Sequence, residues 1–130
     1  MTPPGARGID AILEGQPIPV HVNAPSVYNP IHDSDIAAML PAMLAAASVP
    51  TTIVNWGGDD PVSIEDYCRY AGQLLGVEPK FRYTEDTYPA NTMDTTHMHE
   101  VLGPCEVGWK EGFRRLLQAK FPDRVLQDAG

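Results

Sequence analysis

The sequence is poor in cysteine and has no long hydrophobic run. Its two cysteines, Cys68 and Cys105, form no C-x-x-C motif, so neither a disulfide framework nor a structural zinc site is indicated. No stretch approaches the roughly 20 apolar residues that cross a bilayer. The N-terminus also has no basic segment followed by an apolar run. We therefore expect a cytoplasmic protein that is neither secreted nor inserted in a membrane.

Basic side chains are also scarce. Nine Lys and Arg residues stand against seventeen Asp and Glu residues, which gives a formal net charge of -8. A surplus of negative charge repels phosphate backbones and anionic lipid surfaces. The composition therefore predicts no nucleic-acid partner and no membrane partner.

The remaining composition is typical of a globular domain. The 130 residues are 43% hydrophobic and 20% charged, and thirteen prolines and eleven glycines divide the chain into short segments. We assign residues 1–122 to one domain of short helices with a few short strands, and 123–130 to a polar tail. The patterns predict helices at 6–14, 33–48, 63–75, 95–102 and around 109–117, and strands at 18–22, 51–56 and 80–84.

The predicted helix at 33–48 has an apolar stripe with the spacing of one buried helical face. Asp33 or Ser34 is expected to cap its first amides, and Asp33 and Asp35 suit the positive end of the helix. The stripe consists of Ile36, Met39, Leu40, Met43, Leu44 and Ala47.

The N-terminal sequence Gly5-x-x-Gly8-x-x-Ala11 is similar to the glycine fingerprint of a dinucleotide site. That fingerprint works because a strand delivers a glycine turn to the start of a helix, where the amides meet the pyrophosphate. Only four residues precede Gly5. We therefore interpret the motif as a loop that enters a helix, and we expect no cofactor-binding residues in this chain.

Three blocks of sequence resemble the extended short-chain dehydrogenases, the NAD-dependent epimerase/dehydratase family. The first is YNPIHDSDIA at 28–37, which leads from a short extended segment into a helix. The second is VNWGGDDPVSI at 54–64, similar to the family's strand, Asn-x-Gly-Gly turn and Ser-initiated helix. The third combines DTTH at 94–97 with LG at 102–103, VGW at 107–109 and EG at 111–112. The blocks occur in the family's order.

The resemblance implies an α/β fold, or α+β for this chain in isolation: the C-terminal, substrate-side lobe of a Rossmann-type enzyme. In such enzymes the Rossmann half holds NAD or NADP and the catalytic tyrosine, while this lobe closes over a small-molecule substrate. A full-length parent would therefore use NAD or NADP. Polar residues on loops and strand ends become the candidates for contact with substrate: Tyr28, Asn29, His32, Asn55, Arg82 and Tyr83.

The sequence departs from the family at several functional positions. Family members that act on nucleotide sugars commonly have an arginine at the position of Tyr28 and another shortly before Asp94, and this chain has neither. Because arginine pairs well with a diphosphate, a neutral or less charged substrate is expected. His97 replaces the usual lysine, and no Tyr-x-x-x-Lys occurs anywhere. The lobe is therefore expected to be catalytically inactive alone.

Other interpretations remain open. One alternative is a stand-alone module, derived from that lobe, that binds a small molecule or a protein. An isolated lobe is also expected to self-associate through the surface that would pack on a Rossmann half. A metal site at His97, His99 and Glu100 has suitable ligand chemistry, but residues i and i+2 point to different sides of a helix. Cys68 lies on the apolar face of its predicted helix, so we interpret it as a core residue and not a nucleophile.

Overall fold

The computed structural model describes residues 4–127. The longest helix has 13 residues, and no helix within the described part of the chain is long and apolar enough to cross a membrane. In chain order, the elements are α1 (Pro4–Glu14), β1 (Pro17–His21), β2 (Val27–Tyr28), α2 (Asp33–Ala45), β3 (Val62–Ser63), α3 (Ile64–Leu75), β4 (Lys80–Thr84), α4 (Thr96–Leu102) and α5 (Trp109–Lys120).

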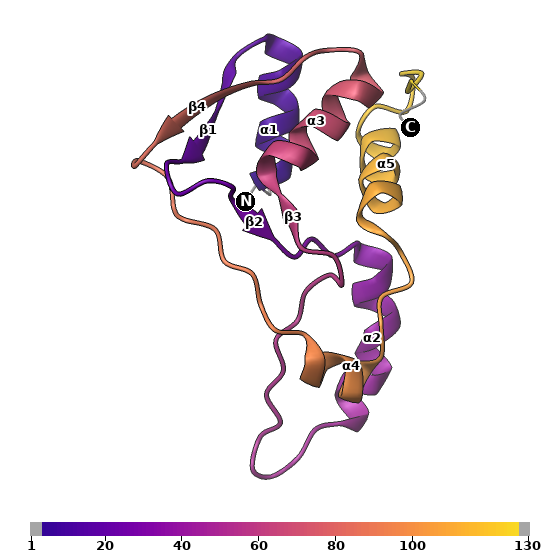
Figure 1. Cartoon of the computed structure of the whole chain (residues 1–130). Helices are drawn as coiled ribbons and strands as arrows, with labels where there is room; N and C mark the ends of the chain where they lie inside the picture. Colours follow the sequence, from indigo (N-terminus) through magenta and orange to yellow (C-terminus); the bar gives the residue numbers. More distant parts are fainter. Residues whose placement is uncertain (1–3, 128–130) are drawn as a thin grey trace.

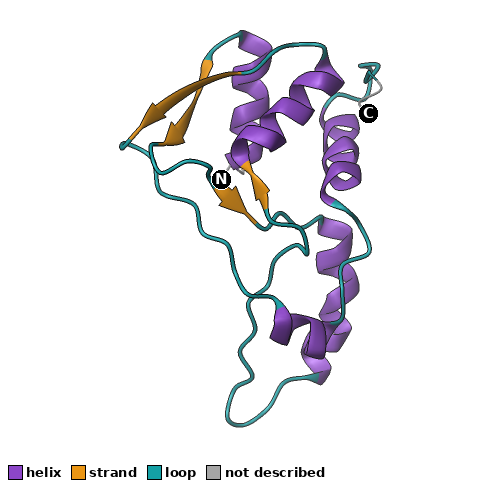
Figure 2. Ribbon diagram, viewed as in Figure 1, coloured by secondary structure: helices purple, strands orange, loops and turns teal. Residues whose placement is uncertain are grey.

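The molecule is elongated (Figure 1). Its upper part in that view gathers α1, α3 and α5 beside the four short strands, and its lower part contains α2, α4 and the long loop that precedes β3 (Figure 2). The mixture of short helices with a small parallel sheet confirms the predicted fold class.

The three helices of the upper part pack around one apolar core. Ile12 of α1, Leu74 of α3, and Phe113 and Leu117 of α5 are each at most 3% exposed. The ring of Tyr67 lies 4.1 Å from that of Phe113, measured between centroids. Burial of a side chain of this size stabilises a fold by about 1.5–3 kcal/mol, so these contacts fix α3 between its two neighbours.

β1 and β4 form a two-stranded parallel sheet in which Pro17 lies opposite Lys80 and His21 opposite Thr84. The Val22 N–H extends the pairing by donating to the Thr84 carbonyl at 3.2 Å. Within residues 4–127, β1 has a neighbour on one side only, as its prolines predict, because proline cannot donate to a ladder. Since the strands are parallel, their carboxyl ends lie at the same edge, and the segments after β1 and β4 start side by side.

α3 begins and ends where the sequence predicts. The Asp66 N–H donates to Ser63 Oγ at 3.1 Å, and Gly76 ends the helix with φ 73°, a conformation that favours glycine. Ser63 also belongs to β3, which pairs antiparallel with β2. The start of α3 is thereby attached to the segment that follows β1.

The chain after α5 returns to the core. Leu126 packs against the core cluster, and the Gln127 N–H donates to the Leu74 carbonyl at 2.9 Å. The described part of the segment that we assigned to a polar tail is thus attached to the end of α3.

α2 begins at the predicted residue, Asp33, but its cap differs from the prediction. Its N-cap is His32 and not Asp33 or Ser34, because the His32 Nδ1 accepts the Ser34 N–H at 3.1 Å. The backbone of His32 is extended, as a cap requires. The helix ends at Ala45, earlier than the predicted 48.

The prediction of a fully buried stripe on α2 is also wrong. Met39 is 4% exposed, but Leu40 is 46% and Leu44 78% exposed. α2 packs against α4, while these two leucines remain exposed to solvent. The spacing of apolar residues in a sequence predicts which side chains share one face of a helix. It does not predict whether another part of the protein packs against that face.

Residues 51–56 do not form the predicted strand. The segment is a loop in which Thr51, Ile53 and Asn55 are exposed while the alternate residues are half-buried, so the period of two is present. Within residues 4–127 it has no ladder partner. Side chains attach it to the fold instead: the Trp56 Nε1–H donates to Met39 Sδ at 3.3 Å, and Asn55 Nδ2 donates to the Asp94 carbonyl at 3.1 Å.

The glycines of the N-terminal motif lie within α1, which begins at Pro4, and not in a loop that leads into the helix. A dinucleotide fingerprint requires its glycines in the turn before the helix. Gly5 and Gly8 therefore do not have the position that would offer amides to a pyrophosphate.

Candidate functional site

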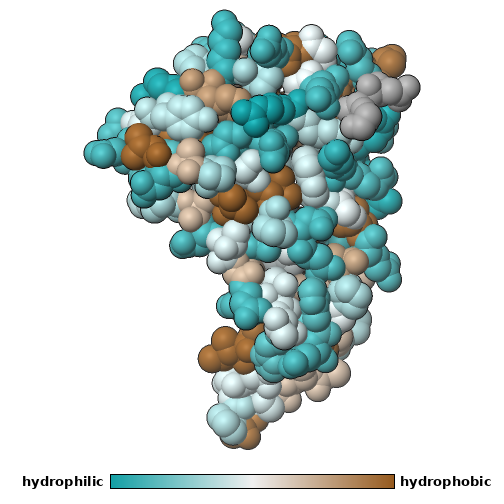
Figure 3. All heavy atoms as spheres, in the orientation of Figure 1, coloured by the Kyte–Doolittle hydropathy of each residue, from teal (hydrophilic) through white to brown (hydrophobic). Residues whose placement is uncertain are grey.

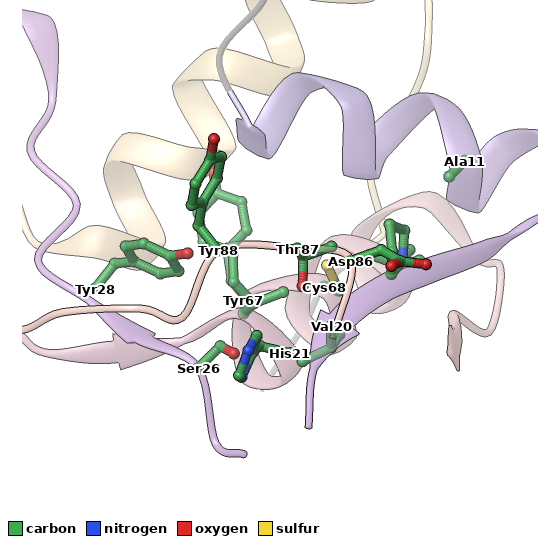
Figure 4. A pocket seen from close by; sticks show the side chains of 13 residues that line it. Ala11, Val20, His21, Ser26, Tyr28, Tyr67, Cys68, Asp86, Thr87 and Tyr88 are labelled. Carbon is green, nitrogen blue, oxygen red and sulfur yellow. The ribbon is translucent and has the colours of Figure 1, made fainter. Parts of the chain in front are cut away.

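A pocket of about 390 Å³ opens at the carboxyl ends of β1 and β4 (Figure 4). This edge of a parallel sheet is where ligands commonly bind, and small-molecule sites usually measure about 300–1,000 Å³. The pocket is lined by β1, the segment between β1 and β2, the first two turns of α3 and residues 86–88 after β4. The parallel pairing of the two strands brings these separate segments together.

Two hydroxyl groups in this pocket have no hydrogen-bond partner in the described part of the chain. Ser26, which is 4% exposed, and Thr87 each have a buried side-chain oxygen without a partner among residues 4–127. A buried polar group without a partner costs about 1–3 kcal/mol. Because both residues line the pocket, a ligand with its own donors and acceptors can supply the missing bonds.

Three tyrosines form much of the pocket wall. Tyr28 follows β1 in the chain, Tyr67 comes from α3, and Tyr88 comes from the segment after β4 (Figure 4). Ile18 and Val20 of β1 contribute apolar surface. The site therefore combines flat aromatic walls with a few hydroxyl groups, which suits a compound with a ring.

The titratable groups of α3 in the pocket stay protonated at neutral pH. Burial raises the pKa of the Tyr67 hydroxyl well above its usual value, and the neighbouring Cys68 adds to the effect. Burial also raises the pKa of the Cys68 thiol to about 12, with Glu65 adding to the shift and Arg69 opposing it. Because the thiolate is the nucleophilic form of cysteine, the pKa of Cys68 argues against a catalytic thiol.

The lining residues of the pocket, all in the described part of the chain, include no lysine and no arginine. Asp86 supplies the one carboxylate among the lining side chains, and His21 the one imidazole. A phosphate group is normally bound by arginine forks or lysine ammonium groups. The local charge therefore disfavours a phosphorylated ligand.

Of the six predicted substrate contacts, Tyr28 lines this pocket. Asn29 joins two loops instead: its Nδ2 donates to the Gly58 carbonyl at 3.1 Å, and its Oδ1 accepts the Met93 N–H at 3.0 Å. Asn55 Nδ2 donates to a main-chain carbonyl, that of Asp94, at 3.1 Å. Both amide side chains thus have structural partners outside the pocket.

His32, Arg82 and Tyr83 lie elsewhere. His32 caps α2 and packs beneath α5, where a Cβ on Gly112 would come within 3.2 Å of its side chain. Arg82 is exposed in β4 and does not line the pocket. Tyr83 borders a separate, shallow concavity near the start of α3, together with the buried Glu65, whose carboxylate oxygens have no partner among residues 4–127.

The sequence analysis missed most residues of this pocket. His21 ends β1, Ser26 precedes β2, and Asp86, Thr87 and Tyr88 follow β4. The signal that identifies them is their position after two strands that end at the same edge. That signal becomes visible only once the two strands are known to be parallel neighbours.

The two histidines of the metal hypothesis pair with different carboxylates. His97 lies 3.4 Å from Glu100, whereas His99 Nε2 lies 2.7 Å from Asp59 Oδ1. Burial raises the pKa of Asp59, but the hydrogen bonds from His99 and the Cys105 N–H outweigh it and hold the pKa below its usual value. Within residues 4–127, no group of three His, Cys, Asp or Glu side chains is placed to hold a metal ion.

No protein-family model and no curated protein matches the chain. Solved structures do share its fold. The dTDP-glucose 4,6-dehydratase of Bacillus anthracis, in complex with NAD, matches with a TM-score of 0.74 and 15% identity over 94% of this chain and 40% of its own. The UDP-glucuronic acid 4-epimerase of Bacillus cereus, with UDP-glucuronic acid and NAD, gives 0.71 and 16% over 86% and 37%. The GDP-mannoheptose C4 reductase of Campylobacter jejuni, with NADP bound, gives 0.66 and 13% over 90% and 44%.

The chain spans about two fifths of the length of these enzymes. At such identities the likeness extends to the fold alone, and at that level the resemblance inferred from the three sequence blocks is confirmed. The chain has the fold of part of the Rossmann-type extended short-chain dehydrogenases, among them NAD-dependent epimerases and dehydratases.

Proposed function

We propose that this chain is the substrate-binding portion of an NAD(P)-dependent epimerase-, dehydratase- or reductase-like protein. The pocket at the carboxyl ends of β1 and β4 receives the small-molecule substrate. The observation that supports this most strongly is the pair of buried hydroxyls, Ser26 and Thr87, that line the pocket without a partner in the described chain. The similar solved structures bind NAD or NADP and are more than twice as long as this chain.

On this proposal the chain does not carry out hydride transfer alone. The sequence has no Tyr-x-x-x-Lys pair, and general acid–base catalysis needs a group whose pKa lies near the working pH. Tyr67 does not fill that role, because burial moves the pKa of its hydroxyl further from neutrality. The cofactor and the acid–base group belong to protein outside this chain. Both Cys68 and Cys105 are free thiols, which favours the reducing cytoplasm as its location.

Titration of the purified chain with NAD and with NADP in a calorimeter tests this division of roles. We expect no heat of binding at micromolar cofactor, because Gly5 and Gly8 lie inside a helix and not in a phosphate-binding turn. One of the similar full-length enzymes, titrated in parallel, serves as the positive control. Micromolar affinity of this chain for either cofactor contradicts the proposal.

The exposed leucines of α2 support a further part of the proposal, self-association of the isolated chain through the surface that would otherwise pack on a Rossmann half. Leu40 and Leu44 lie one helical turn apart, and Val49 and Ile53 in the following loop are 101% and 77% exposed. Hydrophobic surface is visible near the lower tip of the molecule (Figure 3). Large exposed apolar patches usually mark interaction sites.

Sedimentation of the wild-type chain and of Leu44→Glu tests this surface. The wild type is expected to self-associate with rising concentration, and Leu44→Glu to shift the equilibrium toward monomer by about tenfold or more, since it places a charge in the apolar contact. Val125→Glu, at a residue that is 91% exposed near the other end of the molecule, is the matched control. A wild type that stays monomeric and is highly stable to heat favours the alternative, a stand-alone binding module.

A further inference from the structure

The chemistry of the pocket at the carboxyl ends of β1 and β4 also restricts what it binds. The pocket has no lysine and no arginine, and its one carboxylate, that of Asp86, repels anions. The whole chain has a formal net charge of -8, so the long-range field acts in the same direction. A ligand with a phosphate or diphosphate would lose its hydration and find no lysine or arginine among these side chains.

The pocket also has neutral hydrogen-bonding groups. Ser26 and Thr87 each offer a hydroxyl that both donates and accepts, and neither has a partner in the described residues. The hydroxyl of Tyr67 remains protonated, because burial raises its pKa. Neutral hydroxyl groups are well matched by the hydroxyl groups of a ligand, which donate and accept in the same way.

The shape of the pocket favours a ring. The side chains of Tyr28, Tyr67 and Tyr88 extend into the same space in Figure 4, and Ser26 lies below them in that view. Its volume of about 390 Å³ is at the lower end of the range for small-molecule sites, about 300–1,000 Å³. One ring with its substituents fills such a space, and the apolar face of the ring can lie against the tyrosines.

We infer that this pocket takes an uncharged, polyhydroxylated ring, such as a sugar or a glycoside without phosphate. The inference rests on the proposed function, because it names the substrate class of the same site. It separates this chain from the UDP- and dTDP-linked sugars of the similar solved enzymes. The hydroxyls of the ring satisfy Ser26 and Thr87, and its carbon-bound face packs on the tyrosine walls.

Two-dimensional NMR of the ¹⁵N-labelled chain, titrated with matched pairs of ligands, tests the inference. The neutral set is methyl and phenyl glucosides and mannosides, and the anionic set is glucose 1-phosphate, mannose 1-phosphate and UDP-glucose. We expect a neutral glycoside to shift the amides of residues 18–28 and 86–88. It should bind at least tenfold more tightly than the phosphate of the same sugar.

Variants of the two hydroxyls separate a role in binding from a role in the fold. Ser26→Ala and Thr87→Val are expected to weaken the glycoside by fivefold or more each while leaving thermal stability unchanged or raised, because each hydroxyl has no partner to lose. Ser48→Ala is the control, since the Ser48 hydroxyl is exposed and donates to the Pro50 carbonyl, away from the pocket. Unchanged affinity in both pocket variants overturns the inference.

The outcomes distinguish the two levels of the proposal. Equal or tighter binding of the phosphates at the same amides overturns the substrate class and leaves a substrate-binding lobe in place. If no member of either set shifts residues 18–28 or 86–88, the proposed function itself fails.

Discussion

Replacement of Gly58 by alanine is expected to destabilise the fold by about 3 kcal/mol, at the upper end of the usual cost of overpacking. A Cβ on Gly58 would lie 1.7 Å from the Pro30 carbonyl oxygen and 2.7 Å from the Pro30 carbonyl carbon. Both are main-chain atoms, which cannot rotate away. The Gly58 N–H donates to the Asn29 carbonyl at 3.1 Å, and the Gly58 carbonyl accepts from Asn29 Nδ2 at 3.1 Å, so separating the two segments also breaks these bonds.

Gly108→Ala is the matched control for this substitution. A Cβ on Gly108 would meet no atom within 4 Å, and the residue is the N-cap of α5 without a side-chain bond. The control is therefore expected to change the free energy of unfolding by no more than about 1 kcal/mol. Urea denaturation followed by circular dichroism gives both values. Equal effects at the two glycines would refute the steric explanation.

The close approach at Gly58 explains why the second sequence block contains Gly-Gly, and it shows what the sequence alone left unspecified. The block predicted a turn after a strand, and in residues 51–56 the burial alternates with a period of two although no strand forms. Neither the absence of a ladder partner in the described chain nor the contact with Pro30 follows from local sequence. Both depend on how the segment around residue 57 lies against the segment around residue 29.

Elements with local signals were predicted closely. Ser63 and Gly76 bound α3 because a hydroxyl cap and a left-handed glycine act within one turn of the helix ends. β4 has the predicted bounds, Lys80–Thr84. The burial of the apolar side chains of α2 could not be predicted from the sequence. The same apolar spacing occurs in a helix whose apolar face is packed against a neighbour and in one whose apolar face is exposed. Leu44 has the spacing of a buried residue, yet it is 78% exposed.

Only some residues of the candidate pocket could be predicted from the sequence. Tyr28 was identified from a block that resembles a family. Ser26 and Thr87, which carry the proposal, lie in short polar segments that look like ordinary loops. They lie close together because β1 pairs with β4, and residues 22–79 separate these two strands in the sequence. Local periodicity predicts each strand but contains no information about which strands become neighbours.

Replacement of Asp35 by alanine is expected to cost about 3–5 kcal/mol of unfolding free energy, since it removes a buried carboxylate and leaves two partly buried N–H donors without their acceptor. Asp35 is 3% exposed, and its two carboxylate oxygens accept the N–H groups of Glu106 and Val107 at 2.9 and 3.1 Å. These amides lie between α4 and α5, so one side chain attaches the start of α2 to that connection. The sequence predicted only that the Asp35 carboxylate would favour the positive end of the helix. The two hydrogen bonds to Glu106 and Val107 are a second role that the sequence did not predict.

Asp33→Ala separates the contribution of the helix dipole from that of the hydrogen bonds to Glu106 and Val107. Asp33 lies in the same first turn of α2, but its side chain is 90% exposed, and it faces His32 at 3.1 Å. If the helix dipole alone accounted for both carboxylates, the two alanine variants would lose the same free energy, about 0.3–1 kcal/mol. We expect that loss for Asp33→Ala only. Asp35→Asn keeps the shape and one acceptor oxygen, so in urea denaturation it should fall between the wild type and Asp35→Ala, because only one of the two amides loses its partner.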